Sequence, residues 1–437
     1  MASAEAATRP FQDMPQITIP DDYHFRLGQF LAEMYESHGP IFRSQRVVYM
    51  VGPEANKFVL LTNREKFSHH IGWGQAVGIV DMFGDGLLTM DGPEHDAHRK
   101  LMNPAFAITY MDRYVPLMNR VIRERIAGWA ERGEIDIYEE ARKITFDVAA
   151  EALTGLRTGP EVDHFRELFM SILTLGMTVA TEEEFETRFT ALHDELYGMI
   201  RPKIAERRAH PTDDILGLLV QARDEQGNYL SDERIIGHAN ILLVAGHETS
   251  TSLAAWLFTL LTQHPDAAQR VLAEQLDLVG PDAEPTLANI KAMRYLDNAL
   301  LEAERMYPPV GNGPRGVIED FDFNGYHVPA GAFVMYGIAA SHLIPSIFAD
   351  PETFDPDRFA PPREEHKRTP YALVGFGGGP RVCIGINFAK VEIKALISQA
   401  LRRYQLELVP DQQLTQFYRI TALPLYGIRM RVRERAR

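Results

Sequence analysis

The chain has 437 residues, of which 45% are hydrophobic and 24% are charged, a composition typical of a folded globular protein. Its formal net charge of -15 argues against a nucleic-acid partner, which needs a basic face, and against a general anionic membrane partner. The single cysteine excludes an intramolecular disulfide and a zinc site built on several thiolates.

The N-terminal residues carry no targeting signal that the sequence reveals. No basic stretch followed by an apolar run occurs there, and no run of about 18 apolar residues occurs anywhere. We therefore expect no signal peptide, no membrane span and a cytoplasmic location, with which a lone cysteine agrees. Residues 1–19 are predicted to be a flexible tail, and residues 20–437 a single domain, because no repeat or long linker interrupts them.

Short strand-like runs precede a long helical region. The apolar runs at residues 47–51 and 58–61 predict strands. From about Pro93 to Tyr307, apolar residues recur mostly at helical spacing. This spacing predicts one helix that begins near Pro93, one over residues 231–264 and one over residues 289–307.

The second of these helices is the longest. Ser231 can cap its N-terminus, and Pro265 lies just beyond its end. Its roughly 33 residues would span about 50 Å. Because its middle is apolar on most sides, we expect a buried central helix.

After Pro309 the long helical region ends, and the sequence predicts turns and short strands. Residues 321–329 predict a hairpin in which Asn324 and Gly325 form a type I′ turn. A last amphipathic helix over residues 386–404 and a short strand-rich tail follow. The predicted fold class is therefore mainly α with small peripheral β-sheets.

The only cysteine lies in a glycine-rich loop directly before the last helix. The loop reads Phe-Gly-Gly-Gly-Pro-Arg-Val-Cys-Ile-Gly from Phe376 to Gly385. A helix N-terminus stabilises a thiolate, and glycines let the backbone approach the sulfur closely with φ > 0. A lone cysteine is more often a small buried hydrophobic residue, but that interpretation does not explain the glycines, Arg381 and the helix that follows.

Five fixed positions in this loop, Phe376, Gly379, Arg381, Cys383 and Gly385, fill the pattern F-x-x-G-x-R-x-C-x-G. The pattern resembles the haem-binding signature of the cytochrome P-450 superfamily. This resemblance implies the P-450 fold, with the long central helix over a haem. It also implies haem b (iron protoporphyrin IX) as cofactor, with the thiolate of Cys383 as the axial ligand of the metal.

A second motif lies in the middle of the long helix. Ala245-Gly246-His247-Glu248-Thr249 resembles the superfamily's A-G-x-[DE]-T segment. Gly246 lets the helix pass close to a flat ligand, and Thr249 can bond back to the carbonyl of Ala245 and open the helix locally. The resemblance implies that Thr249 holds oxygen and passes protons, with Glu248 as relay. Ordinary back-bonding and a surface salt bridge are the alternatives, and His247 is assigned no role.

Charged residues elsewhere match further parts of the pattern. Glu302 and Arg305 are three residues apart and share a helical face. Taken alone they would be a surface pair that contributes little to stability. The superfamily has an E-x-x-R pair at this place, completed by a later arginine that corresponds to Arg358. The resemblance implies that the three form a buried structural network.

Haem propionates need cationic or hydrogen-bonding partners. His95 and Arg99 resemble the superfamily's H-x-x-x-R stretch and share one helical face, whereas His98 lies off this spacing. Arg315 and Arg381 match two further propionate-binding positions. Each of these residues taken singly could be a solvated surface charge.

The resemblance implies a monooxygenase that inserts one atom of dioxygen into an apolar organic substrate, such as a fatty acid, terpenoid, steroid or retinoid-like molecule. The C-terminal half is similar to the sterol demethylase and retinoid hydroxylase branches. However, the histidine that replaces the acid in demethylases is absent, because Glu248 keeps that place. Two alternatives stay open, a peroxide-using or peroxide-rearranging haem-thiolate enzyme and a non-catalytic haem sensor.

Electrons must come from a separate donor, because the sequence shows no flavin or nicotinamide domain. A ferredoxin or flavodoxin with its reductase is the expected partner. It would dock on a basic patch on the cysteine side of the molecule. The predicted patch consists of Arg99, Lys100, Lys367, Arg368 and Arg381.

Overall fold

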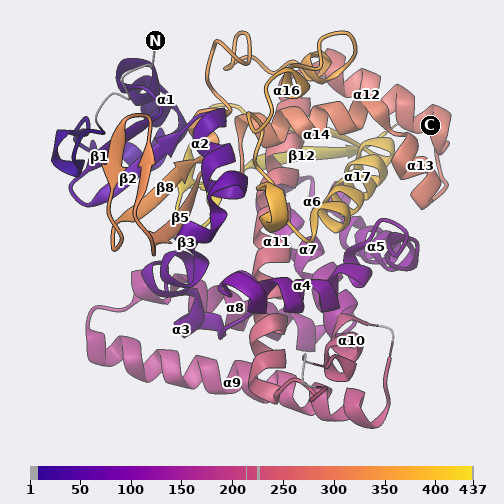
Figure 1. The fold of residues 1–437 in the computed structure, drawn as a ribbon. Coiled ribbons are helices and arrows are strands. Elements are labelled where there is room, and N and C mark those ends of the chain that lie inside the picture. Colours follow the sequence, from indigo (N-terminus) through magenta and orange to yellow (C-terminus); the bar gives the residue numbers. More distant parts are fainter. Residues whose placement is uncertain (1–7, 213, 224–226, 436–437) are drawn as a thin grey trace. The chain divides into compact units, whose positions relative to one another are not determined.

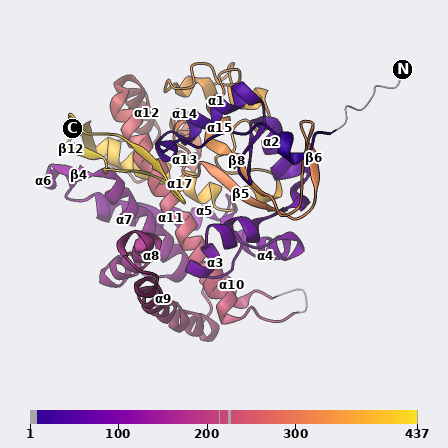
Figure 2. The ribbon, with the colours of Figure 1, turned by 90° about the vertical axis from the view of Figure 1, so that its left-hand side faces the viewer.

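The computed structural model describes residues 8–212, 214–223 and 227–435, and the chain folds into two compact units. Unit 1 comprises residues 1–77, 295–383 and 413–426. Unit 2 comprises residues 78–294, 384–412 and 427–437. Helices dominate and the sheets are small, which confirms the predicted fold class (Figures 1 and 2). The single domain over residues 20–437 stays a prediction.

Unit 1 is built around a five-stranded sheet with the order β1-β2-β8-β5-β3. Strands β2 and β8 are parallel, and the other neighbours are antiparallel. Its elements are α1 (Leu27–His38), β1 (Ile41–Ser44), β2 (Val47–Val51), α2 (Pro53–Lys57), β3 (Phe67–Ser68), α14 (Arg294–Met306), β5 (Asn312–Val317), β6 (Phe321–Phe323), β7 (Tyr326–Val328), β8 (Phe333–Gly337), α15 (Ile338–Ser341), α16 (Glu365–Arg368), β10 (Gln416–Tyr418) and β11 (Ala422–Pro424).

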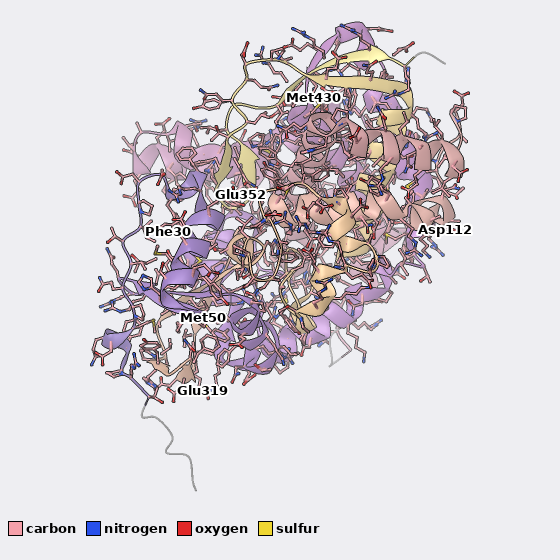
Figure 3. All side chains as sticks on the ribbon, turned by 90° about the horizontal axis from the view of Figure 1, so that it is seen from above. Phe30, Met50, Asp112, Glu319, Glu352 and Met430 are labelled. Atoms are coloured by element: carbon pink, nitrogen blue, oxygen red, sulfur yellow. The ribbon has the colours of Figure 1, made fainter. Side chains whose placement is uncertain are left out.

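The core of unit 1 lies on both faces of this sheet. Strand β2 was predicted correctly, and its run of apolar residues suits a strand that is covered on both sides. Met50 belongs to one hydrophobic cluster and Phe30 of α1 to another. Both residues are labelled in Figure 3. Met14 and Ile17 are 2% and 6% exposed and pack into the same two clusters. The predicted flexible tail 1–19 is therefore too long, because apolar side chains anchor its second half; residues 1–7 lie outside the described residues.

Unit 2 is mostly helical, with one three-stranded sheet of order β4-β12-β9. Its elements are α3 (Ile79–Phe83), α4 (Gly92–Phe106), α5 (Met111–Ile126), α6 (Trp129–Arg132), β4 (Glu134–Asp136), α7 (Ile137–Thr154), α8 (Pro160–Thr178), α9 (Glu182–Ala209), α10 (Ile215–Gln221), α11 (Asp232–Gln263), α12 (Pro265–Leu278), α13 (Leu287–Ala292), α17 (Ile386–Arg403), β9 (Tyr404–Leu408) and β12 (Arg429–Glu434).

The long helix α11 is the core of unit 2 and packs along α7 (Figure 1). As predicted, the hydroxyl of Ser231 caps it by accepting a hydrogen bond from the N–H of Arg234 at 3.2 Å. Most of its residues are buried, as the apolar pattern requires. In the part of the chain that the structure describes, no helix is both long and apolar enough to cross a membrane.

Two local predictions were wrong. Residues 58–61 form a turn of π-helix, Phe58–Thr62, that continues α2, because Pro53 starts a helix there and four apolar residues do not distinguish strand from helix. The helix expected over residues 289–307 is two helices, α13 and α14, separated by Met293 with ψ of 83°. The buried side chain of Met293 interrupts the helix without a proline or glycine signal.

The hairpin prediction is confirmed. Strands β6 and β7 pair from Phe323 to Tyr326, with Asn324 and Gly325 in the turn. Their φ angles of 48° and 79° are both positive, as a type I′ turn requires. The last helix, α17, also begins where it was predicted, at Ile386.

Candidate active site

The cysteine loop of unit 1 is held by its own backbone. The N–H of Cys383 donates to the carbonyl of Phe376 at 2.8 Å, and the N–H of Gly377 donates to the carbonyl of Val374 at 2.8 Å. Gly377 and Gly379 have φ of 73° and 59°, so two of the loop's glycines adopt the left-handed conformation expected from the sequence. The side chain of Cys383 ends up exposed at the end of this loop.

Close packing explains Gly379 further. A Cβ added there would lie 2.3 Å from the carbonyl oxygen of Leu60, so no other residue fits without moving the backbone. Gly385 differs, since it has φ of -85° and precedes the first residue of α17 in an ordinary conformation. The glycine there is therefore not explained by the need for a positive φ.

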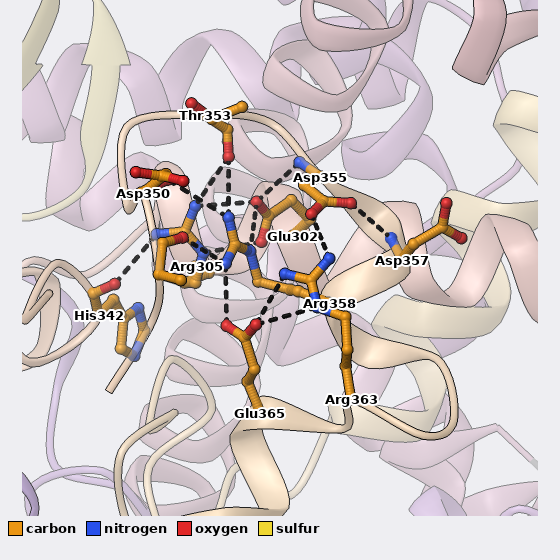
Figure 4. A network of polar contacts seen from close by, with 11 residues as sticks. Glu302, Arg305, His342, Asp350, Thr353, Asp355, Asp357, Arg358, Arg363 and Glu365 are labelled. Carbon is orange, nitrogen blue, oxygen red and sulfur yellow. Dashed lines mark hydrogen bonds and ion pairs between the residues drawn. The ribbon is translucent and has the colours of Figure 1, made fainter. Parts of the chain in front are cut away.

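Glu302, Arg305 and Arg358 meet in unit 1 (Figure 4). Arg305 donates to both carboxylate oxygens of Glu302 at 2.7 and 2.9 Å, and Arg358 Nε donates to Glu302 Oε1 at 2.9 Å. The side chains of Glu302 and Arg305 are 0% exposed and that of Arg358 is 1% exposed. The three predicted network residues therefore form one buried cluster.

The cluster extends beyond the residues that the sequence suggested. Arg358 also binds Glu365 at 2.9 Å, and Arg363 links Glu365 to Asp355 at 2.7 and 2.5 Å (Figure 4). The buried part of the cluster thus pairs two guanidinium groups, Arg305 and Arg358, with two carboxylates, Glu302 and Glu365, whereas Arg363 and Asp355 are about a third exposed. Such balance limits the desolvation penalty of buried ions.

The Ala245–Thr249 segment of α11 presents two different faces in unit 2. Thr249 Oγ1 donates to the carbonyl of Ala245 at 2.7 Å, the back-bond expected from the sequence. Ala245 is exposed, and a Cβ at Gly246 would meet no atom within 4 Å. The helix itself stays continuous, so the predicted local opening does not occur. The middle of a mostly buried helix therefore has an open apolar stretch beside the Thr249 hydroxyl.

Glu248 points to the other side of α11, where it meets α7. Arg142 Nε donates to its Oε1 at 3.0 Å, and the hydroxyl of Tyr138 donates to Oε2 at 3.5 Å. His247 Nε2 lies 3.2 Å from the same Oε1. Burial acts to raise the pKa of Glu248, but His247 and Arg142 outweigh it and lower this pKa to about 2. Glu248 is therefore ionised in a buried ion pair, not in the surface salt bridge that was the alternative.

This pair should make stability depend on pH. Because the folded pKa of Glu248 lies below its ordinary value of 4.5, the pair stabilises the fold above pH 4.5 and loses this effect as pH falls towards 2. Arg142→Met should lower the free energy of unfolding at pH 7 by roughly 3 kcal/mol, and the deficit should shrink at pH 3. Urea unfolding at both pH values measures it.

Lys143→Met is the matched control for this experiment. Lys143 lies on the same helix and pairs with Glu140, but its side chain is 37% exposed. Its loss should cost less than about 1 kcal/mol. If Arg142→Met lowered the free energy of unfolding equally at both pH values, the ion pair with Arg142 would not be what lowers the pKa of Glu248.

The four predicted propionate contacts lie in both units. His95 is 2% exposed on α4, with Nδ1 2.9 Å from Asp96 Oδ1, and Arg99 lies on the same helix, partly exposed. Arg315 is 3% exposed on β5, donates to the carbonyl of Pro314 at 2.7 Å and lies over the ring of Tyr336.

Arg381 ends a 3-10 turn of the cysteine loop and is partly exposed. His98, which the spacing set apart, contacts His238 of α11 at 2.9 Å between ring nitrogens. Within the predicted docking patch, Lys367 forms an ion pair with Glu364 at 2.5 Å. Part of its charge is therefore compensated, and the patch itself stays a prediction.

The sequence matches the family model described as Cytochrome P450 over residues 16–425. The chain belongs to the cytochrome P450 family. It is 33% identical over 400 residues to "Putative cytochrome P450 120" of Synechocystis sp., covering 89% of this chain and 88% of that protein. It is 32% identical over 419 residues to "Putative cytochrome P450 136" of Mycobacterium tuberculosis, covering 93% and 84%. The solved structure of retinoic-acid-bound cyanobacterial CYP120A1 is similar with a TM-score of 0.86 and 29% identity, covering 98% of this chain and 100% of that chain.

As a P450 the protein is a monooxygenase, and its cofactor is a haem held by a cysteine thiolate. P450s generally use dioxygen, apolar substrates and a separate redox partner. The residues present fit a haem, because the only thiol is exposed at the end of a loop held by backbone hydrogen bonds, and α11 has an open apolar stretch at Gly246. Both features suit a flat apolar macrocycle.

Sequence reasoning missed the partners of Glu248 and the second carboxylate partner of Arg358, Glu365. Arg142 and Tyr138 lie on α7, more than 100 positions before Glu248, so no spacing rule connects them. Thr145, also on α7, donates to the carbonyl of His247 at 3.2 Å and ties α7 to the motif. Glu365 lies next to Lys367 and Arg368 of the predicted basic patch. Only its burial and its bond to Arg358 show that it belongs to the charge network.

Proposed function

We propose that Cys383 is the axial haem ligand of a P450 that inserts one atom of dioxygen into an apolar organic substrate. The observation that carries this proposal is the exposed sulfur of the only cysteine, held by the Cys383–Phe376 backbone bond in a family that binds haem through cysteine. When bound, the haem supplies the oxygen-activating chemistry. The residues Phe376, Gly379, Arg381 and Gly385 shape the loop around the thiolate.

The chain's own residues make room for the haem and transfer protons. Ala245 and Gly246 leave room for the macrocycle, and Thr249 passes a proton through Oγ1 towards dioxygen. Glu248 is the relay carboxylate in this proposal, and it must leave Arg142 before it can reach Thr249. The ion pair with Arg142 therefore keeps the relay in a resting position.

Two further groups complete the haem site in this proposal. His95, Arg99, Arg315 and Arg381 bind the propionates through charge-assisted hydrogen bonds. Glu302, Arg305 and Arg358 have a structural role and hold the polypeptide on which the cysteine loop rests.

We infer an elongated isoprenoid substrate of the retinoid, steroid or terpenoid type. The support is similarity to a P450 whose solved structure contains retinoic acid and to a sterol 14alpha-demethylase and a beta-amyrin 28-monooxygenase. We further propose a cytoplasmic protein that receives electrons from a ferredoxin or flavodoxin with its reductase. In this proposal the electron donor docks on the basic patch around Lys367 and Arg368, a local basic region in a chain whose total charge is acidic.

Thr249→Ala should keep haem but uncouple oxygen consumption from product formation. Without the hydroxyl the proton supply fails, so most reducing equivalents should appear as hydrogen peroxide. The substrate for the assay is whichever retinoid, steroid, terpenoid or fatty acid gives the water-displacement shift of the haem absorption band. Oxygen uptake, peroxide and product are measured together with a surrogate ferredoxin system.

Thr259→Ala is the matched control, because Thr259 on the same helix makes the same back-bond, to Ala255 at 2.8 Å. It should stay coupled like the original protein. Tight coupling in Thr249→Ala would remove Thr249 from the proton path.

A further inference from the structure

His342 lies in unit 1 between the charge network and the cysteine loop. The residue follows α15 and is 0% exposed. Its backbone carbonyl accepts a hydrogen bond from Arg305 at 3.1 Å (Figure 4). Its ring Nε2 accepts a hydrogen bond from the N–H of Val374 at 2.9 Å. One residue therefore contacts both the network and the start of the loop.

From Val374 a short series of backbone bonds leads to the sulfur-bearing residue. The carbonyl of Val374 accepts from Gly377, and the carbonyl of Phe376 accepts from Cys383, each at 2.8 Å. The loop also lies close to α14, because a Cβ at Gly375 would be only 2.5 Å from Glu304 Oε1. The loop is therefore pressed against the helix that carries Glu302 and Arg305.

The bond to Val374 fixes the tautomer of His342. Because an N–H donates to Nε2, that nitrogen carries a lone pair and the ring proton is on Nδ1. The carbonyls of Arg305 and Glu304 favour a proton on the ring, although Nδ1 makes no full hydrogen bond with the described residues. Burial, with the charge of Arg305, lowers the pKa of His342 to about 3, so the ring is neutral at neutral pH.

A buried Nδ1–H without a full hydrogen bond costs free energy. However, this tautomer is the one in which Nε2 can accept the hydrogen bond from Val374. We propose that His342 is a positioning residue for Cys383. It connects the Glu302–Arg305–Arg358 network to Val374 by hydrogen bonds and so holds the cysteine loop in place. This inference rests on the proposed function, in which Cys383 binds the haem iron. His342 itself touches neither the substrate nor the cofactor in this proposal.

The test compares two substitutions of similar polarity. In His342→Gln the side-chain oxygen can replace Nε2 as acceptor, whereas in His342→Asn the shorter side chain cannot reach Val374. For the Asn variant we expect about ten-fold faster hydrogen exchange of the Val374 amide. We also expect a larger share of the reduced carbon monoxide complex to have the unshifted Soret band of a haem without thiolate. The Gln variant should stay within about two-fold of the original protein on both measures.

Ser341→Ala is the control for damage to the neighbouring backbone. Ser341 is also buried, but its hydroxyl accepts from Gly52 and Asn56 at 3.0 Å each and not from the cysteine loop. This variant should leave the Soret band unchanged. Equal behaviour of the Gln and Asn variants would overturn the role of His342. An unshifted band in the unsubstituted protein would instead contradict the proposed function, while the exchange rate at Val374 would still test His342.

Discussion

Cys383→Ser should abolish monooxygenation and the strongly red-shifted Soret band of the reduced carbon monoxide complex. A serine hydroxyl stays protonated at neutral pH and cannot donate electron density as a thiolate does. Because Cys383 is the only cysteine, no other thiolate can replace it. The spectrum, recorded together with haem content and circular dichroism, separates loss of the ligand from loss of the fold.

Val382→Ala is the control for this experiment, since it changes the same loop without removing the sulfur. It should keep the red-shifted band. A red-shifted band in Cys383→Ser would eliminate Cys383 as the ligand and with it the central part of the proposed function.

Glu302→Gln should have the largest effect on stability. Glu302 is the carboxylate shared by Arg305 and Arg358, and all three side chains are buried. Its neutralisation leaves excess positive charge in the interior, which costs about 3–5 kcal/mol. Urea unfolding of the haem-loaded protein measures this loss, and we also expect faster release of haem.

Glu364→Gln is the matched control because it makes the same chemical change at an exposed ion pair. Glu364 binds Lys367, whose side chain is 65% exposed. The loss should be much smaller than for Glu302→Gln, because exposed ion pairs contribute little to stability. Similar losses in the two variants would contradict a special function of the buried network.

The sequence predicted the elements whose ends are marked by local chemistry. Helix α11 begins at the Ser231 cap and ends before Pro265, and the hairpin turns at Asn324-Gly325. Each signal acts within a few residues, so it can be read without knowing the fold. The run at residues 58–61 and the break at Met293 carry no such signal, because packing against distant residues decides them.

The same distinction applies to the candidate site. The pair of Glu302 and Arg305 lies within α14, and the back-bond of Thr249 lies within α11. The structure contains both contacts. The ion pair of Glu248 with Arg142 joins positions 106 apart, and the bond from Val374 to His342 joins positions 32 apart. Contacts of this kind depend on how helices and loops pack, which single-sequence spacing does not encode.

The division into two units also bears on how the chain folds as it leaves the ribosome. Unit 2 draws most of its residues from one uninterrupted stretch, 78–294, whereas unit 1 combines residues up to 77 with residues 295–383 and 413–426. Synthesis proceeds from the N-terminus, and contacts between distant positions form slowly. The clusters that contain Met14 and Ile17 are complete only when Tyr336 and Tyr418 have been made, more than 300 residues later. Until then, the apolar surface that these late residues cover is exposed on the nascent chain, which favours binding of a chaperone.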